Sequence, residues 1–274
     1  MKSLTALLIA IPIALALSYA DLKEGLVAYY SFDSGTPKDD SGMGNHGKVV
    51  KGNPKVVDGQ IGKALDFDGD DGIEVPDNPT LQLADALTVA CWVYPRSVVD
   101  PNNKLDHCGI CWKGQMIGWG SNVYNWRIAT CNPQGLTWGA CGGGVEGWFH
   151  TGNCFKDGLE KWYHVALVED GKEGTAYING EPLTDADVTG GNRHRPMAPY
   201  DVWEGEPVRI GWAQGHSGNI NTLTFFDGII DEVAIYNRAL SADEIKELMT
   251  RRPIAVSPSD RLATTWGDVK RGIY

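Results

Sequence analysis

Short stretches of alternating hydrophobic and polar residues, separated by turn-forming residues, occupy most of the chain after residue 22. Alternation with a period of two is typical of β-strands that bury one face. The pattern predicts strands at residues 26–32, 63–67, 72–75, 87–94, 123–130, 161–168, 174–179, 207–212 and 229–236. The 34 glycines and 14 prolines are too many for a helical bundle. We therefore expect an all-β protein.

Two local patterns predict particular elements. Asn179 and Gly180 separate two short apolar stretches, and this dipeptide is the strongest sequence signal for a two-residue hairpin turn. Residues 241–249 form the only convincing helical pattern, because Ser241 and Glu244 have the spacing of a capping box ahead of an apolar stripe. We expect one hairpin and one short C-terminal helix.

The first 20 residues have the organisation of a secretory signal peptide. Lys2 precedes an apolar run over residues 4–17, which is shorter than the roughly 20 residues that span a membrane. An uncleaved anchor is the alternative. We expect a secreted or cell-surface protein with no membrane insertion after signal removal. Its globular domain would cover residues 21–250, followed by a tail at 251–274.

The charge of the chain limits its partners. It has 35 acidic and 24 basic side chains, which gives a formal net charge of −11. A protein of this charge with no basic cluster lacks the electrostatic surface that binds phosphate backbones or anionic lipid. We expect no nucleic-acid partner.

Seven blocks occur along the chain in an order that is specific to one family. They are GLVAYYSFD (25–33), DSGMGNHG (40–47), GKALDFDGDDGIEVP (62–76), LTVACWVYP (87–95), KWYHVALVEDG (161–171), AYINGEPL (176–183) and DGIIDEVAIYNRALSADEI (227–245). Over residues 24–249 the chain resembles a laminin G-like domain of the concanavalin A-like lectin/glucanase superfamily. The resemblance implies a jelly-roll sandwich of two antiparallel sheets whose concave face binds carbohydrate or protein. Residues 98–155 are not covered by the blocks and look like an insertion rich in Cys, Trp and Gly.

The chain lacks the acidic motif expected of a glucanase from this superfamily. No Glu-x-Asp-x-x-Glu spacing occurs, and the consecutive Asp231 and Glu232 would point to opposite faces of a strand. There is also no Gly-x-Ser-x-Gly nucleophile motif. We expect no catalytic residues. A divergent glycan-cleaving enzyme is an alternative.

One acidic residue is expected to be buried. Asp231 shares a predicted strand face with Ile229, Val233 and Ile235, and a buried carboxylate needs a partner or a metal. The resemblance implies calcium as cofactor, with candidate ligands Asp33, Asp40, Asn45 and Asp231. The alternative is that Asp231 accepts backbone N–H groups. The acidic residues 66–72 are interpreted as a tight turn between strands, because they lack the glycine and flanking helices of an EF-hand.

An even number of cysteines in an exported chain predicts disulfide bonds. The six residues are Cys91, Cys108, Cys111, Cys131, Cys141 and Cys154. Their pairing is left open by the sequence. The alternative is a zinc site that uses Cys108 and Cys111 with His107, His150 or another cysteine.

The uncovered segment also contains five of the ten tryptophans of the chain. They are Trp112, Trp119, Trp126, Trp138 and Trp148. Exposed on one surface, such rings would stack on sugar rings as a ligand-binding platform, with flanking Asn122, Asn125, Arg127 and His150 as hydrogen-bonding groups. The alternative is that they fill the core of a loop region. The sequence therefore predicts a non-catalytic module whose partners are glycans or glycoconjugates, with a protein adhesion module that binds extracellular proteins as the alternative.

Overall fold

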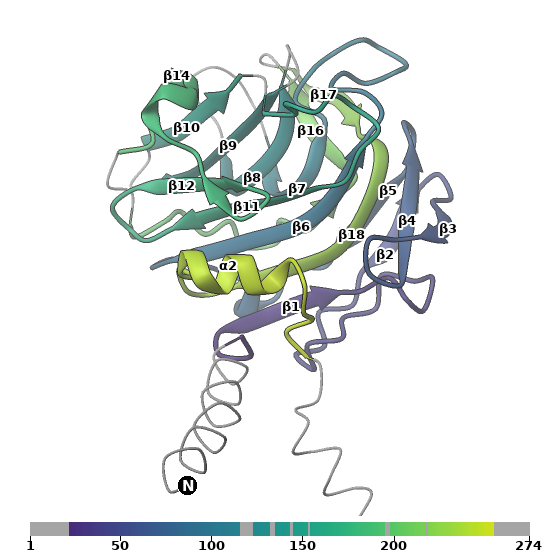
Figure 1. Cartoon of the computed structure of the whole chain (residues 1–274), viewed down its shortest axis with the longest axis horizontal. Coiled ribbons are helices and arrows are strands. Elements are labelled where there is room, and N and C mark those ends of the chain that lie inside the picture. The colour runs from purple at the N-terminus through teal and green to yellow at the C-terminus, as the bar shows by residue number, and fades with distance from the viewer. Residues whose placement is uncertain are drawn as a thin grey trace, which may run out of the picture.

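The computed structural model describes residues 22–115, 123–131, 135–142, 145–152, 154–194, 198–216 and 219–254. The expected signal peptide and residues 255–274 of the expected tail lie outside these ranges. In the described part of the chain, no helix combines the length and apolar character that crossing a bilayer requires. The architecture is an all-β jelly-roll sandwich (Figure 1).

The first sheet has eight antiparallel strands in the order β13-β12-β11-β6-β18-β4-β3, and β1 also pairs with β18. These strands are β1 (Leu26–Tyr30), β3 (Lys55–Asp58), β4 (Lys63–Asp68), β6 (Leu87–Pro95), β11 (Tyr163–Glu169), β12 (Gly174–Ile178), β13 (Glu181–Pro182) and β18 (Asp227–Tyr236). The first and last strands of the described chain are therefore neighbours in one sheet.

The second sheet also has eight antiparallel strands, in the order β14-β10-β9-β8-β7-β15-β5-β2. These strands are β2 (Lys48–Lys51), β5 (Gly72–Val75), β7 (Gly109–Gln115), β8 (Val123–Cys131), β9 (Gly135–Gly142), β10 (Val145–Thr151), β14 (Val188–Gly191) and β15 (Val208–Ile210). A separate hairpin of β16 (Trp212–His216) and β17 (Asn219–Phe225) packs beside β7.

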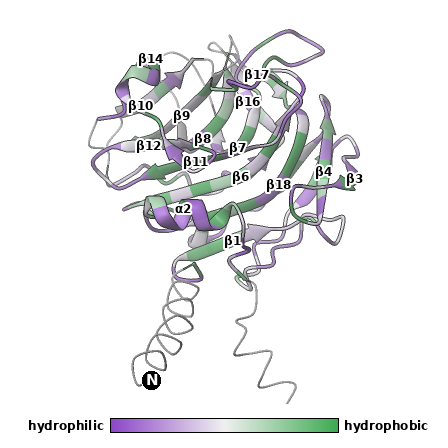
Figure 2. Ribbon diagram, viewed as in Figure 1, coloured by the Kyte–Doolittle hydropathy of each residue, from purple (hydrophilic) through white to green (hydrophobic). Residues whose placement is uncertain are grey.

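The main hydrophobic core lies between the two large sheets. Val89 and Val93 of β6 share it with Ile128 of β8 and Leu136 of β9, and all four side chains are fully buried. Figure 2 shows hydrophobic residues concentrated on β1, β6 and β18. Burial of such side chains from both sheets is the main stabilising contribution in a sandwich.

The opposite face of the first sheet is covered by the predicted C-terminal helix. Helix α2 (Ala242–Leu248) begins after Ser241, and the Ser241 Oγ and Glu244 carboxylate form the expected capping box. Ile245 of α2 joins a second apolar cluster with Ala90 and Ala166 of the sheet. The helix prediction is confirmed, and Figure 2 shows the hydrophilic side of α2 facing the viewer.

The predicted Asn179-Gly180 hairpin is also confirmed. Ile178 of β12 pairs with Glu181 of β13, and the two turn residues have φ values of 50° and 77°. Positive φ at both positions is the signature of a type I′ turn. A Cβ added to Gly180 would lie 2.8 Å from side-chain atoms of Lys246 and Met249, so this turn packs closely against the end of α2.

The acidic residues 66–72 contain the expected tight turn, at residues 69–71, which connects β4 of the first sheet to β5 of the second. Asp71 stabilises it, because its Oδ2 accepts a hydrogen bond from the Asp68 backbone N at 3.0 Å and its Oδ1 accepts one from Asn53 N. The carboxylates of Asp68, Asp70 and Asp71 come together on this turn.

Strand β18 contains a bulge that the alternation pattern did not predict. Its register with β6 shifts between Asp231 and Ala234, and Glu232 has a φ of 53°. An extra residue in one strand places the residues before the bulge on the opposite face from the one that simple alternation predicts. Consequently Ile230, Val233 and Ile235 belong to the main core, whereas Ile229 and Asp231 lie on the other face before the bulge. The expectation that Asp231 shares a face with Val233 and Ile235 was therefore wrong.

Residues 98–155 differ from the loop-rich insertion that we considered. They contain β7, β8, β9 and β10, which are four adjacent strands of the second sheet. The alternative interpretation of these residues as a loop region without regular structure was therefore wrong. Their many glycines and cysteines pack between close neighbours, so the strands do not show the usual alternation of large apolar and polar residues.

Candidate functional site

The second sheet has one face in the main core and one face turned away from it. The core side is formed by a single cluster of large apolar side chains: Trp126, Ile128, Leu136, Trp138, Ala140 and Phe149. Successive residues of a strand point to opposite faces. The residues between them on β8, β9 and β10 therefore form the other face, which we call the outer face: Arg127, Ala129, Cys131, Thr137, Gly139, Cys141, Trp148 and His150.

Three of the five tryptophans predicted as a sugar platform are fully buried, and for these three the prediction was wrong. Trp126 and Trp138 point into the main core, where Trp138 Nε1 donates a hydrogen bond to Thr151 Oγ1 at 2.9 Å. Trp112 packs with Ala213 of the β16–β17 hairpin. Trp119 lies outside the described residues, and Trp148 is half-buried.

Trp148 and Arg127 lie in one row across the outer face. Arg127 is opposite Gly139, and Gly139 is opposite Trp148 on the next strand. A Cβ at Gly139 would lie 2.3 Å from the Gly147 carbonyl oxygen, so no side chain fits between the other two. The row therefore has an aromatic ring and a guanidinium group on either side of a buried residue that has no side chain.

The next row contains polar atoms without partners. Thr137 is opposite His150, and neither Thr137 Oγ1 nor His150 Nδ1 has a hydrogen-bond partner although both atoms are buried. The His150 ring packs on Trp148 with a centroid separation of 4.6 Å. Burial, together with the positive charges of His107 and Arg127, lowers the pKa of His150 to about 4. The ring is therefore neutral at pH 7 and keeps a lone pair available to a ligand.

Arg127 supplies a buried cation to the same face. It is 2% exposed, and its guanidinium carbon lies 5.5 Å from the centre of the Trp112 ring. Trp112 of β7 is opposite Arg127 in the same row, and this stacking fixes the position of the guanidinium group. Asn125 was also considered, but its Nδ2 donates to the Leu83 carbonyl oxygen at 3.1 Å in the interior. Asn122 lies outside the described residues.

All six cysteines are buried thiols, so the prediction of three disulfide bonds is not confirmed. Cys91, Cys108, Cys111 and Cys154 belong to the main core. The considered zinc pair Cys108 and Cys111 is not part of a metal-type cluster in the described chain. Cys131 instead lies with His107 and His150, with one ligand atom of each within 4.8 Å of the others.

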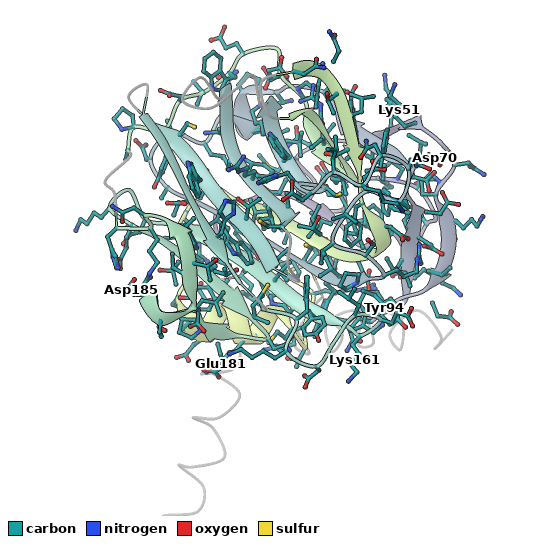
Figure 3. All side chains as sticks on the ribbon, turned by 90° about the horizontal axis from the view of Figure 1, so that it is seen from above. Lys51, Asp70, Tyr94, Lys161, Glu181 and Asp185 are labelled. Atoms are coloured by element: carbon teal, nitrogen blue, oxygen red, sulfur yellow. The ribbon has the colours of Figure 1, made fainter. Side chains whose placement is uncertain are left out.

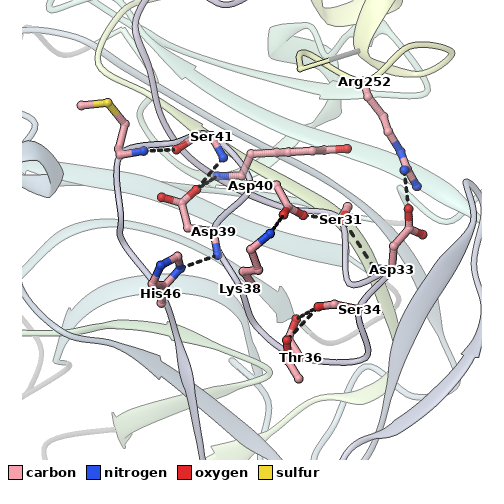
Figure 4. A network of polar contacts seen from close by, with 12 residues as sticks. Ser31, Asp33, Ser34, Thr36, Lys38, Asp39, Asp40, Ser41, His46 and Arg252 are labelled. Carbon is pink, nitrogen blue, oxygen red and sulfur yellow. Dashed lines mark hydrogen bonds and ion pairs between the residues drawn. The ribbon is translucent and has the colours of Figure 1, made fainter. Parts of the chain in front are cut away.

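The four predicted calcium ligands do not converge. Asp33 Oδ1 accepts a hydrogen bond from Lys63 N at 2.9 Å, and its carboxylate pairs with Arg252, which lowers the pKa of Asp33. Asp40 Oδ2 accepts one from Ser31 Oγ at 2.7 Å and pairs with Lys38 (Figure 4). Each carboxylate thus has its own protein partners.

The other two candidates lie in the interior. Asn45 Nδ2 donates to the Val27 carbonyl oxygen at 2.7 Å. Asp231 is fully buried, its Oδ2 accepts a hydrogen bond from Ile61 N at 3.0 Å, and burial raises its pKa to about 7. The backbone contact that we named as the alternative is the arrangement observed. These residues do not fit a single calcium site, and calcium binding stays an untested prediction.

The acidic loop is organised by a residue that the sequence did not single out as a ligand. Asp39 is 3% exposed, and its two carboxylate oxygens accept hydrogen bonds from the backbone N–H groups of Tyr29, Ser41 and Asn45. His46 Nδ1 accepts one from Asp39 N at 3.1 Å. The neighbouring Asp39 and Asp40 thus have different roles, because only Asp39 points into the loop (Figure 4).

Comparisons with solved structures find the same fold in other proteins. Domain 4 of AbnA, a GH43 extracellular arabinanase from Geobacillus stearothermophilus in complex with arabinotriose, aligns with a TM-score of 0.55 and 22% identity. The alignment covers 82% of this chain and 98% of that domain. At this identity the likeness establishes the fold alone.

Two toxin domains show the same likeness. The binding domain of Paraclostridial Mosquitocidal Protein 1 aligns with a TM-score of 0.59 and 20% identity, over 83% of this chain and 52% of that one. The binding domain of botulinum neurotoxin DC in complex with rat synaptotagmin II aligns with a TM-score of 0.61 and 13% identity, over 83% and 52%. The present chain spans about half of each toxin domain.

The sequence comparisons agree with the fold. No curated protein matches the chain. A family model described as the concanavalin A-like lectin/glucanases superfamily matches residues 67–246, which include the strands from the end of β4 to β18 and nearly all of α2. The chain therefore belongs to the concanavalin A-like lectin/glucanase superfamily.

Proposed function

We propose that this chain is a non-catalytic carbohydrate-binding module. The observation that carries the proposal is the row formed by Arg127, Gly139 and Trp148 on the outer face. A half-buried indole next to a residue without a side chain accepts the apolar face of a sugar ring. The guanidinium on the other side of the gap donates hydrogen bonds to hydroxyl or carboxylate oxygens.

The neighbouring row supports the same proposal. An unpartnered buried polar atom costs about 1 to 3 kcal/mol. A sugar hydroxyl or a bridging water at His150 Nδ1 and Thr137 Oγ1 would remove that cost. Binding of a ligand on the outer face is therefore favoured, because these polar groups are already positioned to bond to it.

The positions of the buried acids favour binding over hydrolysis. Glycosidases flank the scissile bond with two carboxyl groups. Among the buried carboxyls of the described residues, those of Glu169, Asp231 and Glu232 belong to strands of the first sheet, and those of Asp39, Asp71 and Asp100 lie in loops. The three strand carboxyls bond to Tyr200, to the Ile61 backbone and to Tyr29, respectively, and the three loop carboxyls accept hydrogen bonds from backbone N–H groups, so all six are engaged within the protein.

The relatives bind ligands of the proposed type. The arabinanase domain is in complex with arabinotriose, and a botulinum neurotoxin DC binding domain has been solved with SialylT. We also propose that the chain is exported, since its first 20 residues resemble a signal peptide. An N-terminus that begins near residue 21 in protein recovered outside the cell would support export, and an intact N-terminus would contradict cleavage.

The glycan proposal is tested by measuring binding to a panel of soluble polysaccharides, including arabinan and sialylated glycans, by calorimetry. We expect Trp148→Ala to weaken binding at least tenfold, which corresponds to about 1.4 kcal/mol of lost stacking. The matched control is Trp162→Ala, a half-buried tryptophan that packs on Tyr94 beside the first sheet. Equal binding by the two variants, or no binding by the wild type, would contradict the proposal.

A protein adhesion module is the second candidate, and one surface favours it. Val49 and Val50 of β2 and Val56 of β3 are 43%, 41% and 50% exposed, and β2 and β3 are edge strands of the two sheets. Exposed apolar residues that are contiguous often mark protein contacts. A botulinum relative is in complex with the protein synaptotagmin II. Retention of an extracellular protein that is abolished by Val56→Lys and unaffected by competing sugar would favour this function.

A further inference from the structure

Three potential metal ligands from separate parts of the chain meet at one end of the outer face. His107 precedes β7, Cys131 ends β8, and His150 lies near the end of β10. One ligand atom of each lies within 4.8 Å of the other two. Cys131 is buried and the two histidines are half-buried.

The backbone around His107 is fixed in a rarely populated conformation. His107 has a φ of 60°, in the left-handed region that non-glycine residues seldom adopt. Its N–H donates to the Thr130 carbonyl oxygen at 2.9 Å, and its own carbonyl oxygen accepts from Thr224 Oγ1 at 3.0 Å. These contacts hold His107 beside the last residues of β8. Strain retained by surrounding contacts is typical of ligand-binding positions.

Each imidazole is oriented by a neighbouring group. The Asp106 carboxylate lies 3.0 Å from His107 Nδ1, so in the tautomer that donates to it the lone pair is on Nε2. The His150 ring is packed on Trp148, and its buried Nδ1 has no hydrogen-bond partner. A carboxylate behind a histidine is the usual support of a metal-binding imidazole.

We propose that His107, Cys131 and His150 bind a zinc ion. Two imidazoles and a thiolate are ligands that zinc prefers, and a tetrahedral ion bound at 2.0–2.3 Å holds its ligands about 3.5 Å apart. Small side-chain rotations from the observed separations reach that distance. Three protein ligands leave the fourth position for water or for an oxygen of a bound molecule.

The competing use of Cys131 is a disulfide bond. Cys154 is close enough for a charge on Cys131 to raise its pKa. A bridge between these two residues would remove the thiolate and leave the two histidines without their third ligand. The two states exclude each other, so one set of measurements distinguishes them.

The test uses the full mature chain, purified with and without reductant, stripped with chelator and titrated with Co²⁺. We expect one equivalent to bind, with the visible bands of a tetrahedral ion and a thiolate-to-cobalt charge-transfer band. Cys131→Ser should abolish the charge-transfer band, whereas Cys141→Ser, a buried cysteine on the same face, should retain it. Zn²⁺ should displace the cobalt and bleach both features.

A second variant separates ligation from folding. Asp106→Asn leaves all three ligands in place and should weaken Co²⁺ binding by about 10- to 100-fold with an unchanged melting temperature. The proposal is overturned if the charge-transfer band survives in Cys131→Ser, if no Co²⁺ binds, or if peptide mapping shows a Cys131–Cys154 bridge in the unreduced protein. These readouts contain no glycan, so they succeed or fail independently of carbohydrate binding.

Discussion

Arg252 Nε lies 2.9 Å from Glu232 Oε1 and joins the segment after α2 to the bulge of β18. The Glu232 side chain is 5% exposed, and burial raises its pKa to about 7. Arg252 also donates to the Ile61 carbonyl oxygen at 2.9 Å and pairs with Asp33 (Figure 4). Arg252 thus contacts three separate parts of the sandwich, at Glu232, Ile61 and Asp33.

Replacing this arginine should leave a buried carboxylate without its cation. We expect Arg252→Ala to lower the free energy of unfolding by about 3 kcal/mol, as for other disrupted buried pairs. Urea denaturation measures the change. Arg251→Ala is the matched control, because Arg251 forms an i,i+4 pair with Glu247 on α2, a contact worth less than about 0.5 kcal/mol. Equal losses in both variants would contradict a special role for Arg252.

Glu169 should make the stability depend on pH. It is 4% exposed, and burial raises its pKa to about 8, with smaller effects from Tyr200 and Asp170. Because the folded-state pKa exceeds the unfolded value of 4.5, the folded protein binds the proton more tightly. This contribution to stability is complete below about pH 4.5 and is lost as the pH rises to about 8, at about 1.4 kcal/mol per pKa unit.

Melting curves between pH 5 and 8 measure this dependence. Glu169→Gln keeps the shape of the side chain and removes its charge, so its melting temperature should fall less across this range than that of the wild type. Glu181→Gln is the control, because Glu181 is exposed at the surface and pairs with Lys246 (Figure 3). Parallel curves for wild type and Glu169→Gln would show that Glu169 does not titrate as described.

Trp138 should be a structural residue. It is fully buried in the main core, and its indole N–H bonds to Thr151 Oγ1. Trp138→Ala removes a large core side chain and should cost about 3 to 5 kcal/mol of stability. Trp162→Ala should cost less, because Trp162 is half-buried. A Trp138→Ala protein as stable as wild type would mean that this ring is not in the core.

Gly180 should be required for full stability of the fold, for two separable reasons. An alanine there adopts an unfavourable φ of 77°, and its Cβ meets Lys246 and Met249 of the α2 region. Gly44 has a φ of 81° with no atom within 4 Å of an added Cβ. Gly44→Ala should therefore cost only the backbone strain, about 1 to 2 kcal/mol, and Gly180→Ala should cost more. Thermal denaturation of both variants measures the difference in stability. Equal stability costs would show that the contact of residue 180 with the α2 region does not contribute.

Local patterns in the sequence were sufficient for much of the fold. The Asn179-Gly180 turn, the Ser241 cap and strands such as β6 depend on neighbouring residues, so a short window of sequence contains the determining information. The bulge at Glu232 was missed because it depends on how β18 pairs with β6 over a distance of more than 100 residues. Alternation alone assumes that no extra residue is present.

The candidate site was only partly predictable for the same reason. The described tryptophans of residues 98–155 lie on the second sheet, but strand facing, which the sequence does not show, places Trp126 and Trp138 in the core and Trp148 on the outer face. The cluster of His107, Cys131 and His150 is produced by strand order. No spacing in the sequence indicates that His107 lies beside the end of β8.

The pairing of β1 with β18 sets an order on folding during synthesis. Leu26 of β1 pairs with Tyr236 of β18, so β1 can pair with its neighbour only after almost the whole domain has been synthesised. Contacts of such long sequence separation fold slowly and leave strand edges exposed meanwhile. A chain that stops before residue 227 would lack the central strand joining β1, β4 and β6. Such a nascent chain depends on protection from aggregation until its last strand is available.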